Sequence, residues 1–127
     1  MEFTQDHIHI RCEDVEKTVA WYQKMFDAKL VAKGDAKGMP IYVTDTAGYR
    51  IAFSPKREGM EVEPLTGKHR WGVWQLGFGV KDLDAAMAEL KARGAEFDGE
   101  PWVLGPALRV AFVKAPDGVQ VELLQRG

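Results

Sequence analysis

Two histidines and an arginine stand at alternate positions near the start of the chain, within residues 6–14. Side chains of a β-strand alternate between its two faces, so His7, His9 and Arg11 share one face and the apolar residues between them share the other. An imidazole binds metal ions or carries protons, and a guanidinium group recognises anions. We therefore expect the polar face of this strand to carry chemistry.

The same pattern recurs 68 positions later in the sequence (75 − 7 and 82 − 14). Gln75 occupies the position of His7, and Asp82 occupies that of Asp14. Asp14, or its neighbour Glu13, is placed to cap a helix. Apolar residues at helical spacing recur at the same offset, with Val15, Val19 and Tyr22 matched by Leu83, Met87 and Leu90. We interpret the chain as an internal duplication.

Each half is predicted to contain a strand, a helix and three further strands, which indicates an α+β fold of two βαβββ modules. We expect their strands to form a curved, cup-like sheet with mixed or antiparallel pairing. After the first helix the expected elements are strands at 29–33, 41–44 and 49–53 with a turn at 34–38. The second half is expected to have strands at 73–80, 96–97, 108–114 and 119–124, a helix at 83–93 and a loop at 99–106.

The chain is predicted to be one domain, with module 1 at about 4–54, a linker at about 55–71 and module 2 at about 72–125. A mobile loop over a site is the alternative for the linker. A net charge of −2 gives no basic footprint for nucleic acid, and no apolar run has the length of a membrane span. The single cysteine, Cys12, cannot form an internal disulfide. We expect a cytoplasmic protein.

The repeated module, together with the stretches DHIHIRCEDVEKTVAWY and APDGVQVELL, resembles the vicinal oxygen chelate superfamily of glyoxalases, bleomycin resistance proteins and extradiol dioxygenases. In that family the two modules form a cup around a divalent metal ion. The ligands come from the first and last strands of each module. The resemblance implies that the four ligand positions are occupied here by His7, Ala52, Gln75 and Glu122.

Three of these residues can bind a metal ion, and Ala52 cannot. The resemblance thus implies that His7, Gln75 and Glu122 bind a divalent ion such as Mn, Fe, Ni, Mg or Zn, because imidazole, amide and carboxylate donors suit fairly hard ions. Open coordination positions would accept substrate oxygens. The alternative for His7 is a hydrogen-bonded core histidine, and Gln75 can satisfy its amide with backbone partners.

The alternation of side chains along the strands supports this assignment of metal ligands without reference to the family. If Glu122 faces the cup, its apolar neighbours along the strand face the helices, and inward-facing Gly77 and Gly79 leave room for a ligand. Three arginines are expected to share the interior and to recognise an anionic substrate, namely Arg11, Arg50 and Arg109. Each could instead pair with an acidic side chain. Trp102 is expected at the pocket mouth, with core or dimer packing as its alternative.

The alanine at position 52 affects which reaction of the family this chain could catalyse. The resemblance implies that glyoxalases use a glutamate at this position to move a proton, which alanine cannot do. Our leading hypothesis is a metal-dependent lyase, isomerase or dioxygenase-type enzyme for a small anionic substrate chelated through two oxygens, with His9 as the candidate proton carrier. The alternative is a metal-free binding protein of the bleomycin-resistance type that sequesters an aromatic or cationic compound. We expect a homodimer by resemblance.

Overall fold

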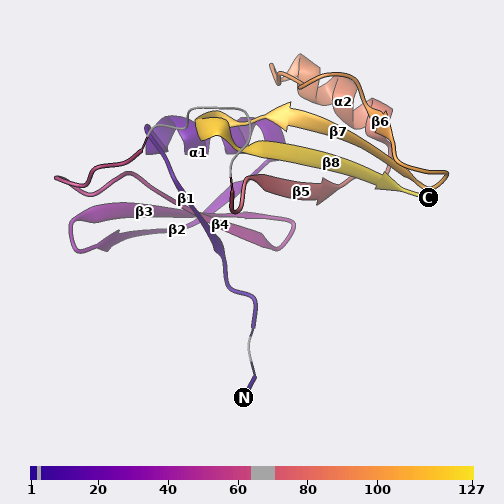
Figure 1. Ribbon diagram of the computed structural model, residues 1–127. Coiled ribbons are helices and arrows are strands. Elements are labelled where there is room, and N and C mark those ends of the chain that lie inside the picture. Colours follow the sequence, from indigo (N-terminus) through magenta and orange to yellow (C-terminus); the bar gives the residue numbers. More distant parts are fainter. Residues whose placement is uncertain (3, 64–70) are drawn as a thin grey trace. The chain divides into compact units, whose positions relative to one another are not determined.

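The computed structural model describes residues 1–2, 4–63 and 71–127, so residues 64–70 of the predicted linker lie outside the described part of the chain. The chain divides into two compact units, Met1–Pro64 and Leu65–Gly127. Both contain a strand, a helix and three further strands in that order (Figure 1). This confirms the predicted pair of βαβββ modules.

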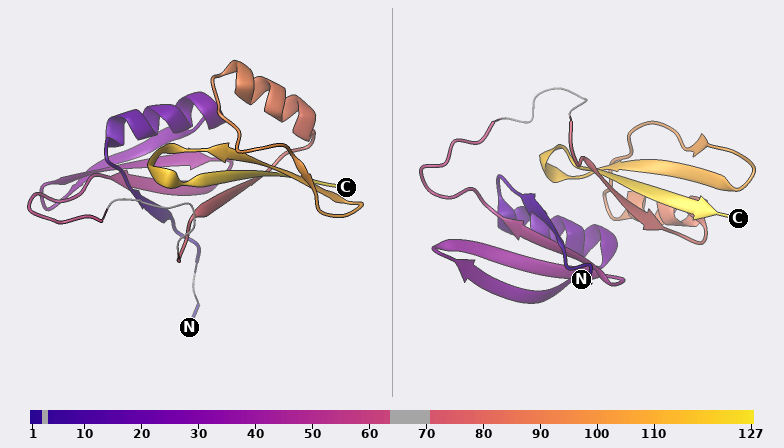
Figure 2. Two further views of the ribbon diagram at one scale, coloured as in Figure 1. Left: turned by 45° about the horizontal axis from the view of Figure 1, so that its top comes forward. Right: turned by 60° about the horizontal axis from the view of Figure 1, so that its bottom comes forward.

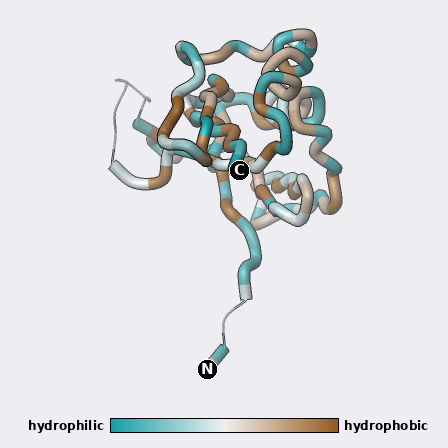
Figure 3. The backbone as a smooth tube through the Cα atoms, turned by 90° about the vertical axis from the view of Figure 1, so that its right-hand side faces the viewer, coloured by the Kyte–Doolittle hydropathy of each residue, from teal (hydrophilic) through white to brown (hydrophobic). Residues whose placement is uncertain are grey.

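The first unit contains one helix and a four-stranded sheet. Its elements are β1 (Ile8–Arg11), α1 (Val15–Phe26), β2 (Lys29–Ala36), β3 (Met39–Thr46) and β4 (Tyr49–Ser54). The strands lie in the order β1-β4-β3-β2, so the first and last strands of the unit are neighbours. Figure 3 shows a hydrophilic segment leading into β1.

The second unit repeats this arrangement, with the strand order β5-β8-β7-β6. Its elements are β5 (Gln75–Gly79), α2 (Leu83–Ala92), β6 (Trp102–Val103), β7 (Leu108–Lys114), a short 3-10 helix (Pro116–Gly118) and β8 (Gln120–Arg126). The last strand again lies beside the first.

Both sheets are mixed because the helix follows the first strand directly. It returns the chain to the starting end of that strand, and two reversals at the following hairpins leave the last strand parallel to the first. Thus β1 pairs with β4, and β5 with β8, in parallel, whereas the other pairs are antiparallel.

In the first unit, α1 lies against one face of the sheet (Figure 2). Asp14 caps it by accepting a hydrogen bond from the backbone nitrogen of Lys17 at 3.1 Å, which selects Asp14 over Glu13 as the cap. The buried ring of Tyr22 packs on Phe53 of β4, with 5.0 Å between ring centroids. This apolar contact places Phe53 on the helix side of β4.

In the second unit, Asp82 caps α2 through the backbone nitrogen of Ala85 at 3.0 Å. Leu83, Met87 and Leu90 are buried on this helix, as their spacing predicts. The helix packs on β7 and β8, where Val121 and Leu123 are also buried. None of the helices in the described part of the chain has the length and apolar character needed to cross a bilayer.

Several elements differ from the sequence prediction. β2 continues through Gly34, which pairs with Ile41, so the predicted turn at 34–38 is wrong and only Lys37 and Gly38 turn the chain. Trp102 lies in an edge strand and not in a loop, because Trp102 and Val103 pair with Val110 and Arg109 of β7. The strand expected at 96–97 is reduced to a single bridge between Phe97 and Val113.

Candidate functional site

The face of the first sheet that α1 leaves uncovered carries the polar residues of β1. His9 is in register with Ala52, and Arg11 with Ser54. Paired residues of adjacent strands share a face, and Phe53 between the two β4 residues packs against α1. His9, Arg11, Ala52 and Ser54 therefore share the face without a helix.

A hydrogen bond joins Nε2 of His9 to the hydroxyl oxygen of Ser54 at 2.7 Å. Ser54 is only 1% exposed, whereas His9 is an exposed residue. Partial desolvation of the imidazole, followed by the nearby charges of His7 and Arg11, lowers the pKa of His9 below its usual range. His9 is therefore held in its neutral form near neutral pH.

His7 lies just before β1, with its ring centroid 6.1 Å from that of His9. Its Nδ1 is hydrogen-bonded to the carboxylate of Asp6. A carboxylate on one ring nitrogen fixes the orientation of the imidazole and increases the basicity of the other nitrogen, as in many metal sites. No hydrogen bond to Nε2 of His7 is recorded within the described residues, so this nitrogen can bind a metal ion.

In the second unit, Gln75 and Glu122 share the face of the sheet that α2 does not cover. Gln75 is in register with Gln120, and its Nε2 donates a hydrogen bond to the Gln120 Oε1 at 2.6 Å. This contact orients the amide of Gln75 and leaves its oxygen as a possible ligand. The partner is a side chain, not the backbone.

Glu122 stands between Gly77 on β5 and Phe112 on β7. Its neighbours Val121 and Leu123 are buried on the α2 side, so Glu122 points to the open face, as alternation predicts. Glu122 is a half-buried residue, and the described residues provide its carboxylate with no recorded hydrogen bond or ion pair. A partly desolvated carboxylate in this position favours a cationic partner.

An aromatic pair lies on the same face. The Trp102 and Phe112 rings meet edge to face with centroids 5.1 Å apart, and Trp102 is 56% exposed. Beside them, a side chain added at Gly79 would meet nothing within 4 Å, whereas one at Gly77 would touch Leu124 at 3.4 Å. The face thus offers an apolar surface next to the Glu122 carboxylate.

The sheet registers place Ala52 in the first unit where Glu122 stands in the second. His9 pairs with Ala52, and Gly77 pairs with Glu122. His9 and Gly77 are themselves 68 positions apart, which is the offset of the duplication. Ala52 therefore occupies the position equivalent to the Glu122 carboxylate.

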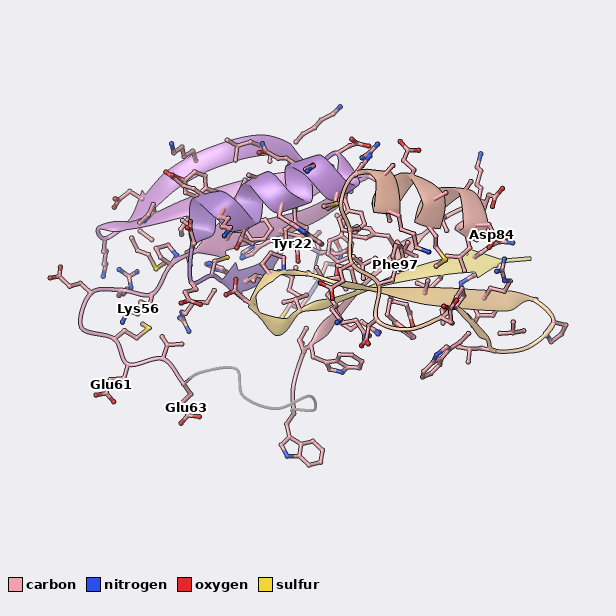
Figure 4. The ribbon with its side chains drawn as sticks, turned by 90° about the horizontal axis from the view of Figure 1, so that it is seen from above. Tyr22, Lys56, Glu61, Glu63, Asp84 and Phe97 are labelled. Atoms are coloured by element: carbon pink, nitrogen blue, oxygen red, sulfur yellow. The ribbon has the colours of Figure 1, made fainter. Side chains whose placement is uncertain are left out.

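The arginines differ in their surroundings. Arg109 donates hydrogen bonds to both carboxylate oxygens of Asp84, at 3.0 and 3.3 Å, and these bonds lower the pKa of Asp84. Asp84 belongs to α2 (Figure 4), so Arg109 lies on the helix side of the sheet. Its expected place in the interior with Arg11 and Arg50 is wrong, and it forms the alternative pair with an acidic side chain. Nε of Arg50 lies 3.8 Å from a carboxylate oxygen of Asp45, and the Arg50 side chain is largely exposed. Arg11 is exposed on the same face as His9.

The three proposed metal ligands are divided between the units, with His7 in the first and Gln75 and Glu122 in the second. Within the ranges that the structure describes, neither unit by itself gathers three or more His, Cys, Asp and Glu side chains into a metal-binding group.

Sequence reasoning missed Ser54 as the partner of His9 and Gln120 as the partner of Gln75. The alternation of side chains along β4 puts Ser54 on the open face but does not identify its partner.

A family model described as "Glyoxalase/Bleomycin resistance protein/Dioxygenase superfamily" matches residues 4–123. A lactoylglutathione lyase of Arabidopsis thaliana is 30% identical over 129 residues, which cover 95% of this chain and 44% of that protein. The chain thus spans less than half the length of this plant relative. A probable lactoylglutathione lyase of Vibrio cholerae is 30% identical over 94% of this chain and 88% of its own length.

Solved structures share the fold. A glyoxylase/bleomycin resistance protein/dioxygenase domain from Frankia superposes with a TM-score of 0.78 at 19% identity, with all of both chains covered. The fosfomycin resistance protein FosX from Listeria monocytogenes gives a TM-score of 0.74 at 21% identity, covering 100% of this chain and 96% of that one. At these identities the likeness establishes the architecture alone.

The lowered pKa of His9 predicts how stability depends on pH. The folded protein binds this proton less readily than the unfolded chain, so the stabilising contribution is complete above the ordinary value of 6.5 and is lost as the pH falls through the lowered folded value. We expect an NMR titration of His9 in chelator-treated protein to have its midpoint below 6.5. His9→Asn should weaken the acid dependence of unfolding. A midpoint at or above 6.5 contradicts this account.

Proposed function

Because the chain belongs to the Glyoxalase/Bleomycin resistance protein/Dioxygenase superfamily, we propose that it is a divalent-metal-dependent enzyme with lyase, isomerase or dioxygenase-type chemistry. Its substrate is a small anion that presents two oxygens to the metal ion. The observation that carries this proposal is Glu122, a half-buried residue for whose carboxylate the described residues supply no recorded partner.

The proposed ligands are His7, Gln75 and Glu122, and each retains an available donor atom. The hydrogen bond of His7 uses Nδ1, and that of Gln75 uses its amide nitrogen. One imidazole nitrogen, one amide oxygen and one carboxylate fit Mn, Fe, Ni, Mg or Zn. When bound, such an ion polarises a substrate carbonyl or hydroxyl oxygen. FosX of Listeria monocytogenes has been described in complex with Mn(II) and sulfate, so Mn(II) is the first ion to test.

Residues of the chain itself bind and orient the substrate in this proposal. Arg11 and Arg50 attract an anionic group through charge-assisted hydrogen bonds. His9, joined to Ser54, exchanges or holds a proton at a substrate oxygen. Trp102 and Phe112 provide an apolar surface for a flat part of the substrate. Arg109 takes no part, because Asp84 already engages its guanidinium group.

The reaction proposed here differs from that named for the lactoylglutathione lyases among the relatives. Ala52 stands where Glu122 stands in the second unit, at the position where the family resemblance implies a glutamate that moves a proton. A methyl group can neither bind the ion nor accept that proton. The first unit offers an imidazole and a hydroxyl instead, in His9 and Ser54.

A metal-free binding protein is the second candidate. The neutral Gln75, already paired with Gln120, and the methyl group of Ala52 favour it, as does the exposed ring of Trp102. In this role Glu122 and the aromatic pair would hold an organic cation.

For either candidate we propose a cytoplasmic homodimer. Light scattering at micromolar concentration tests the dimer, and a monomer would remove that part of the proposal.

Removal of a ligand side chain should weaken metal binding. We expect protein purified without chelator and reconstituted with Mn(II) to retain about one ion per site, and His7→Ala and Glu122→Ala to weaken binding at least about tenfold, or ~1.4 kcal/mol. Elemental analysis and calorimetric titration measure this. Glu89→Ala, which removes a carboxylate on the surface of α2, is the matched control. A full-length protein that takes up none of the candidate ions favours the binding protein.

Restoring a carboxylate at the equivalent position of the first unit should strengthen metal binding. Because Ala52 occupies the place of Glu122, Ala52→Glu is expected to tighten Mn(II) binding about tenfold or more, as one added ligand allows. Ala52 is buried, so Ala52→Met controls for the added volume. Circular dichroism must first show that both variants fold. Unchanged affinity in a folded Ala52→Glu protein would contradict the assignment of this position.

The aromatic surface predicts a preference for ligands that carry a ring. Benzohydroxamate and acetohydroxamate share one two-oxygen chelating group, and only the first has an aromatic ring. We expect the Mn(II)-loaded protein to bind benzohydroxamate about 3- to 10-fold more tightly, the range that one aromatic contact supplies. Trp102→Ala should remove this difference and leave acetohydroxamate binding unchanged. Trp74→Ala is the control, and equal affinities in the unmodified protein would exclude Trp102 from the site.

A further inference from the structure

The hydroxyl group of Ser54 is a buried donor with one recorded partner. Ser54 is 1% exposed, so water is not an available substitute for a protein acceptor. Its backbone oxygen accepts a separate hydrogen bond from the nitrogen of Cys12 at 2.8 Å. Within the part of the chain that the structure describes, the one hydrogen bond of the hydroxyl itself is with Nε2 of His9, at 2.7 Å.

The single hydrogen-bond partner of the Ser54 hydroxyl determines which group donates in the bond between Ser54 and His9. If Nε2 of His9 carried the hydrogen, it would donate to Ser54, and the hydroxyl hydrogen would be left buried without an acceptor. A buried polar group without a partner costs ~1–3 kcal/mol. If the hydroxyl donates to an unprotonated Nε2, both groups are satisfied. The hydrogen of the neutral imidazole then resides on Nδ1.

We propose that Ser54 is a positioning residue that holds His9 as the Nδ1–H tautomer. The ring nitrogen left for a ligand is thus a hydrogen-bond donor. No hydrogen bond to this nitrogen is recorded within the described ranges, and His9 is exposed. What this donor does rests on the proposed function: it would stabilise negative charge on a substrate oxygen and would not remove a proton from substrate carbon.

The tautomer can be measured directly in the chelator-treated full chain by long-range ¹H–¹⁵N correlation of the histidine rings, under alkaline conditions in which the imidazoles are neutral. We expect a protonated-type signal for Nδ1 of His9 and an unprotonated-type signal for Nε2. In Ser54→Ala the hydrogen should redistribute so that Nε2–H becomes the major form, as in free imidazole side chains. Ser54→Thr, which retains a hydroxyl, should restore Nδ1–H.

His9→Asn identifies the His9 signals by their loss, and the His7 signals serve as an internal control because the hydrogen bond of that ring is to Asp6. An Nε2–H tautomer in the unmodified protein overturns the proposal, as does an unchanged Nδ1–H tautomer in Ser54→Ala. If the extra methyl group of Ser54→Thr prevents folding, the unmodified protein and Ser54→Ala still decide the result. No metal ion or substrate is present, so failure of the proposed enzymatic function would leave this measurement intact.

Discussion

Each unit packs a helix against one face of its sheet, and this constraint decides which side chains remain for chemistry. In β4, Ile51 and Phe53 are fully buried, and Phe53 packs against α1, so Ala52 and Ser54 must take the other face. A shift of one residue in the register would put apolar side chains on the open face and polar ones under the helix. The apolar core therefore holds the polar residues in position.

Duplication supplied the same framework twice, and the two copies carry different chemistry at equivalent places. The pair His9 and Ala52 in the first unit corresponds to Gly77 and Glu122 in the second. The first unit has the His9 imidazole hydrogen-bonded to the Ser54 hydroxyl. The second unit has the Glu122 carboxylate paired with a glycine, Gly77. The proposed proton donor, His9, thus belongs to the first unit, and the proposed ligand Glu122 belongs to the second.

Hydrogen-bonding requirements separate the polar residues that are available to a ligand from those that are already engaged. Arg109 forms a two-point contact with Asp84, which engages both terminal nitrogens of its guanidinium group within its own unit. Gln75 and His7 each use one polar atom in a side-chain contact and retain another. Glu122 has no recorded partner in the described segments. These differences leave Glu122 as the residue with the most direct case for binding a cation.

The sequence by itself determined the succession of a strand, a helix and further strands in each half and the open-face position of Glu122, because these depend on local periodicity. It narrowed the first helix cap to Asp14 or Glu13, and it misplaced Arg109, whose partner Asp84 lies on α2. The turn at Lys37–Gly38 and the edge strand at Trp102 required pairing information that local composition does not contain. Only the tertiary structure decided which polar side chains meet. The His9–Ser54 and Gln75–Gln120 pairs each join residues 45 positions apart. Such contacts depend on the register between the first and last strands of a unit, and alternation reveals the face of a side chain but not its neighbour across the sheet.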